Sequence, residues 1–199
     1  MDRTVERLRD LATTINEQSG AVVATANDGS FVIAWVSYGQ DGDTVYEGNI
    51  VAQRYTDTGT KIGKEFVVNS YTTGDQGSVA IAMNDNGSFV VAWYGEGSGG
   101  VMGVYARCYN NSGVATSKQF LVSLASTNTE QAPSVAIAGD GSFVVVWTVY
   151  DSETLESHVF GRCYSAAATA GAIFQVDGAG NLSNGCADVS MAKNGDFVV

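Results

Sequence analysis

One hydrophobic phrase recurs four times along the chain. Its first three copies begin with Gly-Ser-Phe and end in tryptophan, at residues 29–35, 87–93 and 141–147, and a fourth copy begins at Gly195. Their phenylalanines stand 58, 54 and 54 residues apart. Apolar residues fill successive positions within each copy, so both faces of such a strand are apolar and its sheet must be covered on both sides. The regular period predicts a repeat architecture.

Three further strands complete each repeat. The strand before the phrase shows period-two alternation, and Asp-Gly or Asn-Gly then supplies the tight hairpin turn. We expect third strands at residues 50–55, 104–109 and 159–164, and fourth strands at 66–68, 120–122 and 174–176. The resulting repeats cover residues 17–68, 69–122 and 123–176, with a partial repeat at 177–199.

Four antiparallel strands that return every 54 to 58 residues, with two apolar faces, fit the blades of a β-propeller. A β-sandwich is the alternative, but it gives no reason for the whole strand series to return in order. We therefore predict an all-β fold of three full blades and a hairpin. Propellers close with about four to eight blades, so we expect either a piece of a longer protein or two copies that complete one ring.

Residues 1–16 differ from the repeats. Val5, Leu8, Leu11 and Ile15 recur at three- and four-residue steps among charged residues, which is typical of a short amphipathic helix. A degraded strand is the alternative, because this segment occupies the place of a fourth strand. The pattern favours the helix.

The net charge and the cysteine content exclude several classes of partner and of structural site. Ten basic and 21 acidic residues give a net charge of −11, which opposes binding to nucleic acid or to anionic membranes. No apolar run reaches the roughly 20 residues that a membrane span needs. The three cysteines form no Cys-x-x-Cys motif, so neither a disulfide framework nor a zinc site is indicated. We expect Cys108 and Cys163, at equivalent repeat positions, to be small buried thiols.

The repeats resemble a family known from large secreted or surface-attached bacterial proteins. In the third repeat, residues 131–147 carry the Gln-x-Pro start and the Asp-Gly-Ser-Phe-Val-Val-Val-Trp strand of that pattern. The later parts of the pattern are clearest in the first repeat, as Ala-Gln-Arg-Tyr at 52–55 and Phe-Val-Val-Asn at 66–69. Cys108 and Cys163 stand where the family usually has arginine. The resemblance implies propeller blades in an extracellular or cell-surface protein, often beside calcium-binding or adhesive modules. It carries over no catalytic residue.

The connections between second and third strands are the candidate ligand-binding loops. They cover residues 36–49, 94–103 and 148–158, emerge at one end of a propeller, and contain no Lys or Arg. Long loops on a rigid scaffold often carry binding residues. The alternative is that loops of an acidic protein are simply acidic and solvated. The candidate ligand-binding residues are Tyr38, Asp41, Asp43, Tyr94, Glu96, Tyr150, Asp151 and Glu153.

Calcium is the most specific ligand that these loops suggest, and no other cofactor is indicated. Asp41-Gly42-Asp43 resembles the start of a calcium loop, but position 52, where an EF-hand needs glutamate, is alanine. Only a looser site at Asp41 and Asp43 is left. His158 has no nearby nucleophile motif, and the arginines of the third strands are better explained by packing. We therefore assign no catalytic residue.

These observations predict a non-catalytic binding or scaffold module that takes a protein, glycan or calcium ligand. The alternative is a fragment of a sialidase-like or other glycan-acting propeller enzyme. Membrane insertion and nucleic acid are not expected, and a homodimer or a larger parent chain would complete the propeller.

Overall fold

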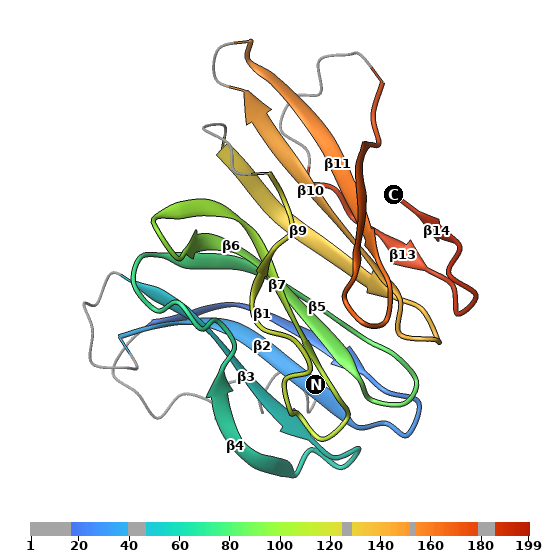
Figure 1. The fold of residues 1–199 in the computed structure, drawn as a ribbon. Coiled ribbons are helices and arrows are strands. Elements are labelled where there is room, and N and C mark those ends of the chain that lie inside the picture. The colour runs from blue at the N-terminus through green and yellow to red at the C-terminus, as the bar shows by residue number, and fades with distance from the viewer. Residues whose placement is uncertain (1–16, 40–46, 125–128, 152–153, 179–185) are drawn as a thin grey trace, which may run out of the picture.

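The computed structural model describes residues 17–39, 47–124, 129–151, 154–178 and 186–199, and these form an all-β structure (Figure 1). Residues 1–16, for which we predicted a helix, lie outside the described residues. The described part contains no helix with the length and apolar character needed to cross a membrane.

Three sheets of four antiparallel strands follow one another along the chain, each with its strands in sequence order. Blade 1 consists of β1 (Gln18–Thr25), β2 (Phe31–Tyr38), β3 (Gly48–Tyr55) and β4 (Lys61–Val67). Blade 2 consists of β5 (Gln76–Met83), β6 (Phe89–Gly97), β7 (Val101–Tyr109) and β8 (Phe120–Leu121). Blade 3 consists of β9 (Thr129–Ile137), β10 (Phe143–Asp151), β11 (Glu156–Tyr164) and β12 (Ala170–Gln175). The hairpin of β13 (Ser190–Met191) and β14 (Phe197–Val198) follows. The predicted four-stranded antiparallel blades are confirmed.

The blades stack face to face, which explains the doubly apolar second strands. Val32 and Ala34 of β2 belong to the same core cluster as Trp93 of β6, so this cluster fills the space between blades 1 and 2. An equivalent cluster between blades 2 and 3 contains Trp147. Stacked aromatic pairs reinforce each cluster, with ring centroids 4.8 Å apart in Phe89–Tyr109 and 4.7 Å apart in Phe143–Tyr164. Such a pair contributes about 0.5–1.5 kcal/mol beyond its buried area.

The connections between second and third strands are shorter than the sequence predicted. Strand β6 continues to Gly97 and pairs it with Val101, so only residues 98–100 connect β6 to β7. In blade 3, β10 runs to Asp151 and β11 begins at Glu156. The prediction of long loops at 94–103 and 148–158 was therefore wrong. Gly95 serves close packing within β6, because a side chain at this position would collide with the carboxamide of Gln76.

Arginines of the third strands join neighbouring blades. The Nη1 of Arg107 donates to the carbonyl of Val68 at 2.9 Å, and the Nη1 of Arg162 donates to the carbonyl of Val122 at 3.1 Å. Both carbonyls lie at the end of the preceding blade's outer strand. These contacts support the structural role predicted for the third-strand arginines.

The cysteines are free thiols, of which Cys108 is buried and Cys163 is half-buried. Burial raises the pKa of both thiols above the ordinary cysteine value. Neither thiol therefore has the lowered pKa of a reactive nucleophile.

Candidate functional site

The inner strands of successive blades lie side by side around a common axis (Figure 1). Between them lies a hollow of about 560 Å³, which we call the central hollow. Its walls are the middle parts of β1, β5 and β9 together with the segment before β13, namely residues 21–23, 79–81, 132–135 and 186–189. The hollow therefore receives side chains from all four repeats.

Each of the three inner strands has a bulge at or just before the residues that line the hollow. The strand ladder shifts register between Ser19 and Val22 in blade 1, and at the matching positions of blades 2 and 3. The bulged residues Gly20, Ser78 and Ala132 have φ angles of 62°, 48° and 36°. Bulges bend a strand and re-aim its side chains, so each inner strand changes direction close to where it begins to line the hollow.

Asp188 brings a carboxylate to the hollow. Its Oδ1 accepts hydrogen bonds from the Ser134 hydroxyl at 2.7 Å and from the Val189 amide at 2.9 Å. Its Oδ2 has no hydrogen-bond partner among the described residues, and Asp188 is exposed. Most of the remaining lining is valine, isoleucine, alanine and proline. The hollow thus combines an apolar wall with one anchored acceptor and one hydroxyl group.

A second polar group surrounds His158, which we predicted to lie in a loop and which lies in β11. Its Nδ1 is 2.9 Å from Asp177 Oδ2, and its Nε2 is 3.5 Å from Glu156 Oε2. The hydrogen bond to Asp177 raises the pKa of His158 above its ordinary value, and Glu156 adds to this effect. The Asp177 Oδ1 accepts the Val159 amide at 2.9 Å, so this carboxylate also caps the edge of the sheet.

Three of the predicted ligand-binding residues that the structure describes lie at or next to strand ends. Tyr38, Glu96 and Tyr150 occupy the same register position in their blades, opposite Gly48, Met102 and Ser157. Tyr38 packs against the core between blades 1 and 2, and the Glu96 side chain lies against Gly74.

Tyr94 and Asp151 also lie on strands, in β6 and β10, and both are half-buried. None of the described candidates lines the central hollow. They share one end of the blades.

Asp41, Asp43 and Glu153 lie outside the described residues. The calcium site at Asp41 and Asp43 therefore stays a prediction. Within the described ranges, no group of three or more His, Cys, Asp or Glu side chains is arranged to hold a metal ion.

Asp188 and Ser134 were missed in the sequence, although a signal was present. The equivalent positions of the four repeats are Val22, Ala80, Ser134 and Asp188, so polarity rises along the series at one inner-strand position. Val22 and Ala80 pack against the core clusters, so a carboxylate at the same position departs from the packing of the other repeats.

No protein-family model matches this sequence, and no curated protein matches it. Solved structures do match. A Hadza microbial sialidase, Hz136, aligns with a TM-score of 0.55 and 16% identity over 77% of this chain. The endo-arabinase from Bacteroides thetaiotaomicron VPI-5482 aligns with a TM-score of 0.56 and 11% identity over 89% of this chain. The chain spans 36% of the sialidase and 67% of the endo-arabinase. These likenesses show the fold, and the chain is built of β-propeller blades.

Proposed function

We propose that this chain supplies blades to a glycan-acting β-propeller that holds carbohydrate in the central hollow. The observation that carries the proposal is the Asp188 carboxylate in a largely apolar hollow at the axis. A sugar ring presents C–H groups on its faces and hydroxyl donors around its rim, so an apolar wall with an anchored acceptor suits both. The fold shared with a sialidase and an endo-arabinase supports the same ligand class.

The charge of the chain favours a neutral sugar. Asp188 adds a negative charge inside the hollow, and the whole chain carries a net charge of −11. A carboxylated sugar would be repelled by both. The expected ligand is therefore a neutral oligosaccharide rather than a sialylated one.

Hydrolysis is the form of action that the two structural neighbours favour over a scaffold role. Glycoside hydrolysis generally uses two carboxyl groups about 5–10 Å apart. Asp188 is the one acidic side chain among the described residues that line the hollow. In the hydrolytic form of the proposal, the second carboxyl group comes from outside this lining.

The test is an isothermal calorimetric titration of the chain with arabino-oligosaccharides and, separately, with sialyllactose. We expect saturable binding of the neutral sugar, and a loss of about tenfold or more in Asp188→Asn because a hydrogen bond to a charged acceptor is weakened. Asp57→Asn is the matched control, since Asp57 is exposed in the turn between β3 and β4 and does not line the central hollow. No saturable binding, or equal loss in both variants, would overturn the proposal. Release of reducing sugar from the same samples separates hydrolysis from binding.

A further inference from the structure

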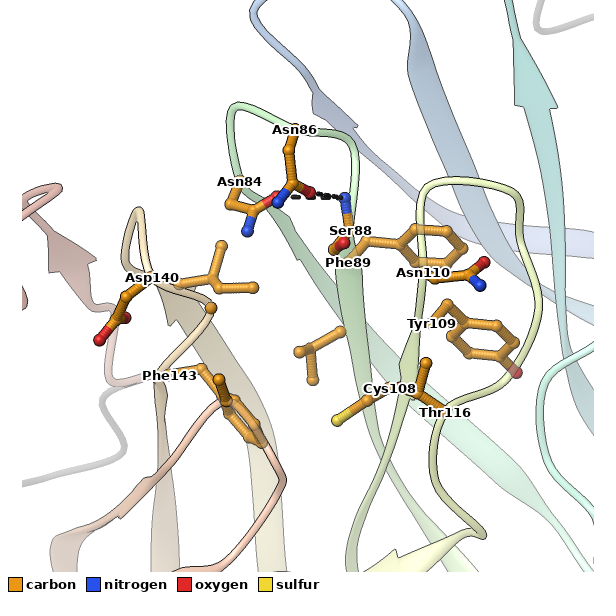
Figure 2. A pocket seen from close by; sticks show the side chains of 14 residues that line it. Asn84, Asn86, Ser88, Phe89, Cys108, Tyr109, Asn110, Thr116, Asp140 and Phe143 are labelled. Carbon is orange, nitrogen blue, oxygen red and sulfur yellow. Dashed lines mark hydrogen bonds between the residues drawn. The ribbon is translucent and has the colours of Figure 1, made fainter.

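A second cavity lies between blades 2 and 3, at the end where the hairpin turns gather (Figure 2). Its volume is about 200 Å³, and we call it the interblade pocket. Cys108 and Asn84 of blade 2 face Phe143 and Ala166 of blade 3 across it. It is separate from the central hollow, with which it shares no lining residue.

The corresponding gap between blades 1 and 2 is bridged by Arg54. Its Nη1 donates to the carbonyl of Ser112 at 2.7 Å, and its Nη2 donates to the carbonyl of Asn111. The arginine stem passes directly over Gly113, where an added Cβ would stand 2.7 Å from Arg54 Cδ. A guanidinium group therefore links the third strand of blade 1 to a turn of blade 2.

Cys108 occupies the position of Arg54 in the next blade. Arg54 pairs with Val32, and Cys108 pairs with the equivalent Val90. The thiol is far shorter than an arginine side chain. It packs in the core cluster between blades 2 and 3, and among the described residues it makes no hydrogen bond to the turn at residues 165–169. The interblade pocket lies beside this shorter side chain.

The turn that an arginine would reach is kept in blade 3. In blade 2, the Asn110 amide donates to the Val114 carbonyl at 2.9 Å, and in blade 3 the Ser165 amide donates to the Thr169 carbonyl at 3.0 Å. The fourth residue of each turn, Gly113 or Ala168, has a positive φ. The two turns therefore have the same backbone conformation.

It follows that the carbonyls of Ala166 and Ala167 are oriented like the two that bind Arg54. No described residue donates a hydrogen bond to either of them. Blade 3 thus keeps the pair of guanidinium acceptors, and no arginine in the described part of the chain donates to them.

Asn84 adds an amide N–H donor to the pocket. The residue is 6% exposed, and its Oδ1 accepts the Ser88 amide at 3.1 Å. Its Nδ2 has no partner among the described residues and is turned into the space between the blades (Figure 2). The equivalent residues of the other repeats are Ala26, Ala138 and Ala192. The Nδ2 group can therefore donate to an acceptor atom of a ligand in the pocket.

We propose that the interblade pocket binds a small guanidino ligand that also carries a hydrogen-bond acceptor, as free arginine does. The guanidinium group donates to the carbonyls of Ala166 and Ala167, where its planar set of N–H donors matches a pair of neighbouring oxygens. The acceptor of the ligand receives the Nδ2 donor of Asn84. The net charge of −11 favours a cationic ligand over a neutral one.

The test is a nuclear magnetic resonance titration of the whole chain with L-arginine and with L-citrulline, its neutral isostere. We expect saturable shifts of residues around Cys108 and Ala166 with arginine at a dissociation constant of the order of 1 mM. Citrulline should bind at least about tenfold more weakly, because hydrogen bonds from a charged donor are the stronger ones. No saturable shift with arginine, or equal shifts with both, would overturn the proposal.

Variants test whether the ligand binds in the interblade pocket. The Ala168 methyl group stands where Gly113 makes room for Arg54, so the double variant Cys108→Arg/Ala168→Gly reproduces the arrangement of blade 1. It should lose arginine binding, because its own guanidinium occupies the acceptors, and should melt at a higher temperature. Ala168→Gly alone is the matched control and should keep binding.

Asn84→Ala tests the site independently, because it removes one hydrogen bond to the ligand without filling the pocket. It should weaken arginine binding by roughly threefold to tenfold, since one neutral hydrogen bond is removed. Unchanged affinity in Asn84→Ala, or binding retained by the folded double variant, contradicts the proposed site.

Discussion

Gln76 is the buried polar residue whose removal tests the packing of blade 2 most directly. Its side chain is fully buried, its Nε2 donates to the Glu96 carbonyl at 2.8 Å, and its Oε1 accepts the Trp93 indole N–H at 3.0 Å. The side chain thus holds the end of β6 against β5, beside the half-buried Glu96. Gln76→Leu keeps a similar shape and removes both hydrogen bonds.

The expected cost follows from the two groups left unpaired. An unsatisfied buried donor or acceptor costs about 1–3 kcal/mol, and the leucine returns about 1–2 kcal/mol through apolar burial. Two such groups together cost about 2–6 kcal/mol, so after the leucine term the midpoint of the expected fall in the free energy of unfolding is about 2.5 kcal/mol. For a domain of 150–250 residues this lowers the melting temperature by about 5–10 °C.

The assay is urea unfolding of the wild type, Gln76→Leu, Trp93→Phe and the double variant. Because Gln76 and Trp93 share a hydrogen bond, the double-mutant cycle should give a coupling of about 0.5–3 kcal/mol. Gln18→Leu is the matched control, since Gln18 holds the same position in blade 1, is half-buried and donates one bond to the Ser37 hydroxyl at 2.9 Å. The reasoning is refuted if Gln76→Leu lowers the free energy of unfolding no more than Gln18→Leu does. It is also refuted if the effects of Gln76→Leu and Trp93→Phe are additive.

Two further predictions concern pH and close packing. Asp177 raises the pKa of His158, so the stability that this contact supplies is complete below the unfolded-state pKa of 6.5 and is lost as pH rises through the folded-state pKa. His158→Gln should flatten the pH dependence of unfolding above pH 6.5, and an unchanged profile would contradict this. Gly97→Ala would push a methyl group into the buried ring of Tyr105 and should cost about 1–3 kcal/mol. Gly77→Ala, with open space around it, is its control, and equal thermal melting curves would show that Tyr105 yields.

The blades were predictable because their cores repeat. Phe31, Phe89 and Phe143 pair with Tyr55, Tyr109 and Tyr164 in the same register, and this regular burial is what the hydrophobic pattern records. The fourth strands were less visible. β4 begins at Lys61, five residues before the predicted start at Phe66. It lies at the outer edge, so most of its residues are exposed and carry no apolar signal.

The predicted loop face was the weakest inference, for a physical reason. Glycine and acidic residues after Trp93 have the composition of a loop, yet they continue the ladder of β6 as far as Gly97. Close contacts decide this, since Gly95 leaves room for Gln76 and Gly97 leaves room for Tyr105. Such contacts join residues that are distant in the sequence, and composition within one segment does not reveal them.

Differences between repeats locate function better than the features that repeats share. The same packing demand acts on every blade, so a residue that departs from its equivalents is not required by the common fold. Asp188 departs from Val22 in the central hollow, and Asn84 departs from Ala26 in the interblade pocket. The arginine of blade 1 also shows directly what the pocket beside Cys108 lacks. Exchanging residues between equivalent positions therefore tests both sites against a conformation that the same chain already adopts in another blade.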